Sequence, residues 1–286
     1  MVVYHVNNMI LITIALTRYN EPDWLLNLTL ESIARQREVN AKVHVLDQSF
    51  HQETKDFCKG LCSESIVFEY QVIPSKGISY ARNVAISLCQ TDILLLTDPD
   101  MLLASDWAYC LSRTLMDKNC AIAGSKIIPR WHKIPRWYMK SNLMTDQYSL
   151  IDFGQGEKET SRIIGGSMGI KIKQIGQQAY FNENLGRKNG TLLGGVDAEF
   201  CERSIQKGFK VYYTGRTVAQ HQILESRMNV FWISRKFYYS GFSRAMRGGR
   251  PSAMNKKRGT ADYIVLGVCA PFYIIGLLIG LLKKRK

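Results

Sequence analysis

The stretch Thr91-Asp-Ile-Leu-Leu-Leu-Thr-Asp-Pro-Asp100 is an apolar run that ends in two carboxylates, Asp98 and Asp100. A short apolar run bounded by polar residues is typical of a strand buried on both faces of an α/β sheet, so we expect a strand over residues 93–96. Ligands bind at the carboxyl ends of such strands. Two adjacent carboxylates repel each other unless a cation lies between them, and a divalent metal bridging to a diphosphate would meet that need. A plain polar turn is the alternative.

Strand-like and helix-like segments alternate along the first hundred residues. We expect further strands over residues 9–16, 41–46 and 66–73, and helices over residues 24–37, 49–62 and 77–88. Asp23 can cap the first of these helices. This alternation predicts an α/β fold with a mostly parallel, doubly wound central sheet flanked by helices.

The second half of the chain breaks this alternation. Residues 131–156 are aromatic, basic and aperiodic, which indicates a long loop or a lid over a site. Gly165 and Gly166 interrupt a strand-like pattern, and glycine there lets another group approach the backbone closely. Further elements are expected as a strand over residues 162–172, a helix that begins within 193–199 and ends at 207, and a strand over 210–214.

The composition is that of a folded protein with reduced cysteines. The chain has 286 residues, 46% of them hydrophobic and 22% charged, which suffices for one large α/β core with an appendage. Its seven cysteines are scattered and odd in number, which argues for free thiols and a cytosolic catalytic portion. The N-terminus lacks the basic segment of a signal peptide, so we expect the catalytic body to face the cytosol.

The positive charge is concentrated in the C-terminal tail. Of the net charge of +14, +12 lies in residues 227–286. Residues 263–282 contain no charged side chain and are long enough to span a membrane as a helix. The basic flanks 256–258 and 283–286 suit anionic lipid headgroups but leave the orientation open. Pro271 permits a kink or a re-entrant hairpin, and a buried core helix is the remaining alternative.

The segment before that apolar run is both basic and aromatic. Residues 227–258 carry nine Lys or Arg and no acid, interleaved with six Phe, Tyr or Trp. Such a segment suits a membrane interface or a single-stranded nucleic acid. The neighbouring apolar run favours the membrane, and we expect no nucleic-acid partner. We therefore divide the chain into a catalytic domain (1–225), a juxtamembrane segment (226–261) and a transmembrane helix with a basic tail (262–286).

Several short motifs follow one another between residues 10 and 248. They are Ala15-Leu-Thr-Arg-Tyr-Asn-Glu21, Val45-Leu-Asp47, Ala81-Arg-Asn83, Asp98-Pro-Asp100, Gly165-Gly-Ser167, Gly194-Gly-Val-Asp-Ala-Glu199 and His221. In this order they resemble a family 2 glycosyltransferase of bacterial type, membrane-anchored and with the nucleotide-sugar-binding GT-A fold. The resemblance implies an inverting, Mg²⁺- or Mn²⁺-dependent transfer from a nucleotide-sugar donor to a lipid-linked or polysaccharide acceptor at the cytoplasmic membrane face.

The resemblance also implies which residues bind the donor. Asp47 would contact the nucleobase, Arg82 the diphosphate or sugar, and Asp98 the ribose or a second metal. The nucleoside pocket would be lined by Thr17, Arg18, Asn20 and Glu21. A turn residue is the alternative for Asp47, and a solvated helix arginine is the alternative for Arg82. Trp131, Trp137 and Tyr138 could stack on a sugar, or else pack in the core or against a membrane.

The metal and the general base are implied in the same way. Asp100 resembles the direct metal ligand of the family, and His221 lies where relatives often present a histidine to the metal. Asp197 would take the proton from the acceptor hydroxyl, with Glu199 as the competing candidate. At a helix start Asp197 would stay ionised, and a plain helix cap is its alternative role. Thr97 and Val196 stand where many relatives carry acids.

Two other functions remain open at this point. A sugar nucleotidylyltransferase also uses carboxylates and a metal on a similar sheet, although a glycine-rich loop after the first strand is missing here. A membrane-tethered module that binds nucleotide-sugars without turnover is the second. The phosphate product released would separate the first from a glycosyltransferase, and binding without turnover would indicate the second.

Overall fold

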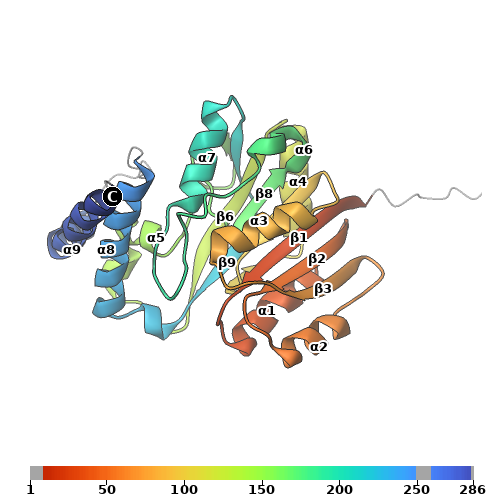
Figure 1. Ribbon diagram of the computed structural model, residues 1–286, viewed down its shortest axis with the longest axis horizontal. Helices are drawn as coiled ribbons and strands as arrows, with labels where there is room; N and C mark the ends of the chain where they lie inside the picture. Colours follow the sequence, from red (N-terminus) through yellow and green to blue (C-terminus); the bar gives the residue numbers. More distant parts are fainter. Residues whose placement is uncertain (1–8, 249–258, 285–286) are drawn as a thin grey trace, which may run out of the picture.

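The computed structural model describes residues 9–248 and 259–284, and one sheet runs through its centre (Figure 1). The strands are β1 (Ile10–Arg18), β2 (Val39–Asp47), β3 (Ile66–Val72), β4 (Ile93–Thr97), β5 (Met101–Leu103), β6 (Ile122–Trp131), β7 (Glu157–Glu159), β8 (Ser167–Lys171) and β9 (Val211–Ile223). The α-helices are α1 (Asp23–Ala34), α2 (Gln52–Gly60), α3 (Ile78–Leu88), α4 (Trp107–Asp117), α5 (Asn142–Gln147), α6 (Ile172–Ile175), α7 (Val196–Gln206), α8 (Val230–Arg247) and α9 (Thr260–Lys284). Short 3₁₀ turns cover Trp137–Lys140, Gly176–Gln178 and Glu225–Arg227.

The strand order is β3-β2-β1-β4-β8-β6-β9-β5, and β7 pairs with β9. The first four of these strands are parallel, as the alternating sequence pattern predicts. From β1, the strands β2 and β3 are added on one side, whereas β4 is added on the other side of β1. Right-handed crossovers therefore require α1 and α2 on one face of the sheet and α3 on the other. β8 runs antiparallel between β4 and β6, which makes the sheet as a whole mixed.

The apolar run of the central strand is fully enclosed. All five residues of β4 are buried, and the strand lies between β1 and β8. Ile12 and Ile14 of β1 and Leu94 and Leu95 of β4 have no exposed surface. Enclosure on both faces explains why this strand carries no alternating polar residues. It also places Asp98 and Asp100 at the edge where β1 and β4 both end.

Three expectations for the second half and the first helix need correction. The segment 131–156 is no continuous loop, because it contains the 3₁₀ turn at 137–140 and α5, and Ile151 forms a bridge with Ile127 of β6. The last strand continues to Ile223, well beyond 214, because β5 and β6 pair with this further part of it. Asp23 is the first residue of α1 and makes no cap; its carboxylate binds Arg18 instead.

The C-terminal helices α8 and α9 pack side by side at one end of the molecule (Figure 1). They run in the same direction, because Gly276 lies against Tyr238 and Gly280 against Ala245. A Cβ atom on Gly276 would overlap the backbone of α8, so glycine allows this close approach. Asp262 fixes the start of α9 by accepting a hydrogen bond from the Leu143 backbone N–H at 2.6 Å.

The apolar run thus forms one continuous helix. Pro271 lies inside α9 without dividing it, so the hairpin alternative is wrong. A buried core helix is wrong as well, since only 22% of the apolar window is buried. The helix is long and apolar enough to cross a membrane. Of the predicted basic flanks, residues 256–258 and 285–286 lie outside the described residues.

Candidate active site

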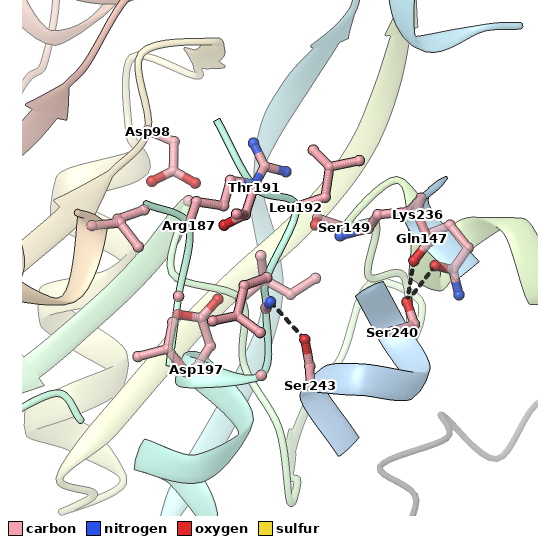
Figure 2. A pocket seen from close by; sticks show the side chains of 18 of the residues that line it. Asp98, Gln147, Ser149, Arg187, Thr191, Leu192, Asp197, Lys236, Ser240 and Ser243 are labelled. Atoms are coloured by element: carbon pink, nitrogen blue, oxygen red, sulfur yellow. Dashed lines mark hydrogen bonds between the residues drawn. The ribbon is translucent and has the colours of Figure 1, made fainter. Parts of the chain in front are cut away.

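A pocket of about 640 Å³ opens at the ends of β1 and β4. Its wall also includes Arg82 of α3, the segment 162–166, the loop 186–195 with the start of α7, α5 with the residues after it, α8 and α9. Figure 2 shows Asp98 on one side of this space, Asp197 below it and Lys236 on the opposite side. The position agrees with the general rule that α/β sheets bind ligands at the carboxyl ends of their strands.

Arg82 of α3 joins two of the carboxylates in the pocket. Its Nη2 donates to Asp98 Oδ1 at 3.1 Å, and its Nη1 donates to Asp197 Oδ1 at 2.5 Å. The guanidinium is only 2% exposed. Although burial alone would lower the pKa of Arg82, Asp197 and Asp98 raise it above its ordinary value. A solvated helix arginine is therefore the wrong description, and the cation fixes the two carboxylates relative to each other.

Asp197 is held at both oxygens. Besides the bond from Arg82 to Oδ1, the Gly165 backbone N–H donates to Oδ2 at 2.9 Å. Asp197 lies in the first turn of α7. It makes no cap of its own helix, because Gly195 occupies the N-cap position. The result is a carboxylate with a fixed orientation that faces the pocket.

Gly165 is a glycine because Arg82 lies against it. A Cβ atom at residue 165 would lie 2.5 Å from the Arg82 Cζ, where ordinary contact begins at about 3.4 Å. Gly166 is close to the other carboxylate, since a Cβ there would lie 3.1 Å from Asp98 Oδ2. The sequence prediction that these glycines allow a close approach is confirmed, and the group that approaches Gly165 is a guanidinium.

Asp100 and His221 form a second cluster, on neighbouring strands. Met101, next to Asp100, pairs with His221 across β5 and β9, and the His221 Nε2 lies 3.2 Å from Asp100 Oδ2. The His221 Nδ1 lies 2.7 Å from the Tyr148 carbonyl oxygen. A carbonyl only accepts hydrogen bonds, so Nδ1 donates to it, and Nε2 is the ring nitrogen that faces Asp100.

Arg227 lies across this cluster. Its Nη1 donates to Asp100 Oδ2 at 2.7 Å and is 3.1 Å from His221 Nε2. Burial alone would raise the pKa of Asp100, but His221 and Arg227 hold it well below its usual range. The carboxylate oxygen and the imidazole nitrogen suit Mg²⁺ or Mn²⁺, so these two residues fit a divalent cation. Such an ion would take over the role of charge partner that Arg227 has here.

The residues predicted for the nucleoside end are only partly brought together. Thr17, Arg18 and Glu21 line the pocket, whereas Asn20 and Asp47 do not. Asp47 has no exposed surface and accepts hydrogen bonds from the Tyr70 hydroxyl at 2.9 Å and the Ser49 N–H at 2.9 Å. Asp47 therefore makes internal bonds in this structure, and its contact with a nucleobase stays a prediction.

Glu199 and the three aromatic residues that could stack on a sugar lie outside the pocket lining. The Glu199 Oε1 accepts a hydrogen bond from Arg203 Nε at 2.8 Å, and Asp197, unlike Glu199, lines the pocket. Trp131 packs edge-on against Tyr148 at 5.2 Å between ring centroids. The aromatic side chains proposed to stack on a sugar, Trp131, Trp137 and Tyr138, are thus not placed around this space.

Residues 13–173, more than half of the chain, match the profile of Glycosyl transferase family 2. The chain belongs to this family. Membership decides against a sugar nucleotidylyltransferase, and it agrees with the order of motifs in the sequence. It defines the chain as a family 2 glycosyltransferase.

Two similar proteins extend the comparison. A curated relative, the glucosyl-dolichyl phosphate glucuronosyltransferase of Haloferax volcanii, is 24% identical over 173 residues, which is 59% of this chain and 55% of the relative. The chain thus spans about half the length of that relative. The crystal structure of GalNAc-T7 with UDP, GalNAc and Mn²⁺ matches 98% of this chain and 58% of its own, with a TM-score of 0.58 and 13% identity. That likeness establishes the GT-A fold.

Several cations that line or border the pocket of this glycosyltransferase are not predicted from the sequence, among them Arg187, Arg227 and Lys236. Arg187 lies in Gly186-Arg-Lys-Asn-Gly190, and a basic loop between glycines is a recognisable phosphate-binding signal. Lys236 lies in the basic aromatic segment, whose pattern suits a membrane interface or a single-stranded nucleic acid and does not by itself indicate a pocket. Because Lys236 and Arg244 of α8 line the pocket, that segment also forms part of the active site.

Proposed function

We propose that the enzyme is an inverting, metal-dependent glycosyltransferase that moves a sugar from a nucleotide-sugar donor to a lipid-linked or polysaccharide acceptor at the cytoplasmic membrane face. The observation that carries the proposal is the pair of ion pairs Asp98–Arg82 and Arg82–Asp197. Through them, Arg82 connects the donor end of the pocket to a fixed carboxylate. A donor at Asp98 and a base at Asp197 would lie on two sides of the reacting carbon.

The chemistry follows from this arrangement. An acceptor hydroxyl oxygen attacks the anomeric carbon from the side opposite the diphosphate, so the new bond forms as the bond to the diphosphate oxygen breaks. Asp197 takes the hydroxyl proton, and the electron pair of the broken bond leaves with the nucleoside diphosphate. Arg82 and the Gly165 N–H keep Asp197 oriented while each oxygen retains a further lone pair.

Asp100 and His221 would hold the divalent cation. When bound, the cation supplies positive charge that stabilises the departing diphosphate. The Asp98 carboxylate is engaged by Arg82 and would contribute through the ribose or the sugar. Arg227 must release Asp100 for the cation to bind, so we expect metal binding to depend on this side chain.

The outer face of α9 supports a location at a membrane. Ile264, Val268, Phe272, Ile275 and Ile279 recur at helical spacing and are each at least 40% exposed. Cations on the neighbouring helix α8 line the pocket, so the apolar face and the charged face point in different directions. An acceptor carried on a lipid would reach the pocket along this edge. Flotation with phosphatidylglycerol vesicles tests the contact, and Leu11→Asp, on an exposed apolar residue of β1, is a control for Val268→Asp.

A thermal-shift screen of nucleoside diphosphates, with and without Mn²⁺, tests the enzymatic proposal. A bound ligand raises the apparent stability of the native state, so we expect one diphosphate to raise the melting temperature only when Mn²⁺ is present. Asp100→Ala should lose this shift, and Asp117→Asn on the surface of α4 should keep it. No shift with any diphosphate would contradict the proposal. Binding without release of a nucleoside diphosphate from any donor would indicate a module without turnover.

A further inference from the structure

Two cations extend into the middle of the pocket from different parts of the chain. Arg187 comes from the loop after Gly186, and Lys236 comes from α8. Figure 2 shows both side chains directed into the same space, between Asp98 on one side and Ser240 on the other. The loop is fixed at both ends, because the Ile78 N–H donates to the Arg187 carbonyl at 3.0 Å and the Gly194 N–H donates to Ser243 Oγ at 2.9 Å.

These two cations differ from the arginines of the site that already have a carboxylate partner. Arg18, Arg82 and Arg227 each have a carboxylate within 3.5 Å. Among the described residues, the side chains of Arg187 and Lys236 have no such ion pair and no hydrogen bond. Two like charges that share a partly buried space without a counter-ion repel each other and lose hydration. The arrangement is favourable only when an anion lies between them.

The lowered pKa values of Lys236 and Arg187 show that positive charge is in excess in this part of the pocket. Burial, followed by the nearby charges of Arg187, Arg162 and Arg227, lowers the pKa of Lys236 to about 7, and Asp197 only partly opposes this. Burial and Arg227 also lower the pKa of Arg187. An oxyanion with two or three acceptor oxygens could bind the guanidinium and the ammonium at once.

The surroundings of Lys236 indicate which molecule carries that anion. Gln147 and Ser240 are hydrogen-bonded to each other beside it, at 2.8 Å. Ser149, also beside it, has a φ of 55°, a left-handed conformation that is uncommon for residues other than glycine. Beyond these polar groups the pocket wall continues into Leu266 and Ala270 of α9. The site therefore combines positive charge with an apolar exit toward the helix that carries the exposed apolar face.

We propose that Arg187 and Lys236 bind a phosphate group of the acceptor, whose apolar chain leaves the pocket along α9. The proposal rests on the proposed glycosyl transfer and specifies the acceptor as a glycan linked to a lipid phosphate, with a sugar hydroxyl as the group that is glycosylated. In this arrangement the phosphate lies between the donor end and α9, with the group to be glycosylated directed toward Asp197. Lys236 and Arg187 position the acceptor and do not accept the proton of the attacking hydroxyl.

Binding of farnesyl phosphate and of farnesol to the full chain in detergent micelles tests the proposal, by isothermal titration. The wild type should bind farnesyl phosphate at least about tenfold more tightly than farnesol, because a single hydrogen bond to a charged group contributes about that much affinity. Lys236→Gln should lose about tenfold for farnesyl phosphate only, and Lys236→Arg should restore most of it. Arg235→Gln is the matched control, because Arg235 is the adjacent exposed cation and lies over the Phe231 ring.

A second titration with the nucleoside diphosphate found in the thermal-shift screen separates the possible sources of the phosphate. We expect Lys236→Gln to bind it as the wild type does. Loss of nucleoside diphosphate binding with farnesyl phosphate binding unchanged would overturn the proposal and assign the site to the donor. Equal farnesyl phosphate affinities for the Lys236→Gln and Arg235→Gln variants would also overturn it. Failure of the wild type to bind any nucleoside diphosphate would contradict the proposed glycosyl transfer alone.

Discussion

Gly165→Ala should inactivate the enzyme without altering any charged residue. The new Cβ would lie 2.5 Å from the Arg82 Cζ, and ordinary contact begins at 3.4 Å, so the guanidinium must retreat by about 1 Å. Flexible side chains can make such a movement, but Arg82 is buried between Asp98 and Asp197. Retreat weakens the bonds to one or both carboxylates and frees the base to rotate.

The expected loss follows from the size of that displacement. Misplacing a catalytic group by 1 Å can cost about 10²-fold in turnover. Overpacking of a buried site typically costs about 1–3 kcal/mol of the free energy of unfolding. Turnover is measured as nucleoside diphosphate release with the donor that the binding screen identifies, and unfolding is followed by tryptophan fluorescence in urea.

Gly60→Ala is the matched control. Gly60 ends α2, and no atom lies within 4 Å of the Cβ that the substitution would add. We expect this variant to match the wild type in turnover and to be as stable or slightly more stable. If Gly165→Ala turned over within twofold of Gly60→Ala, the contact between Gly165 and Arg82 would have no part in orienting Asp197, and the reasoning would be refuted.

Two further predictions concern the charges. Arg82→Gln removes the partner of two carboxylates and should lower the free energy of unfolding by about 3–5 kcal/mol, whereas Arg113→Gln, which breaks a half-exposed pair with Asp117, should cost under about 1 kcal/mol in the same urea experiment. The pKa of Lys236 is lowered to about 7 in the empty pocket, so above pH 7 its amine must take up a proton when farnesyl phosphate binds. Its affinity should therefore fall by up to about tenfold per pH unit from pH 7 to 9, and a fall of the same size in Lys236→Arg would show that another group titrates.

The sequence predicts the part of the fold that local patterns determine. The apolar run before Asp98 forms a fully buried strand, and the alternation of segments produces the parallel half of the sheet. Glycine at residue 165 indicates a close approach, although the identity of the approaching group depends on α3, which is remote in sequence. Hydrophobic periodicity and the positions of glycines depend on only a few neighbouring residues, so a single sequence is enough to recognise them.

Contacts between distant segments are not encoded in this way. Arg187 and Lys236 are separated by a helix and a long strand, and only the packing of α8 against the pocket brings them together. The basic aromatic pattern of α8 is the same whether its cations face lipid or a cavity. Asp47 shows the same limit, because its partner Tyr70 comes from the next strand. Positions after a strand can be predicted, but their bonding partners require the three-dimensional arrangement.

The most direct measurement of the central claim compares the wild type with Asp197→Asn in nucleoside diphosphate release and nucleoside diphosphate binding. The amide keeps the size of the side chain and removes the basic oxygen. We predict that release falls by about 10²–10⁴-fold while the dissociation constant for the nucleoside diphosphate stays within twofold. Release at the wild-type rate by Asp197→Asn would contradict the assignment of Asp197 as the general base.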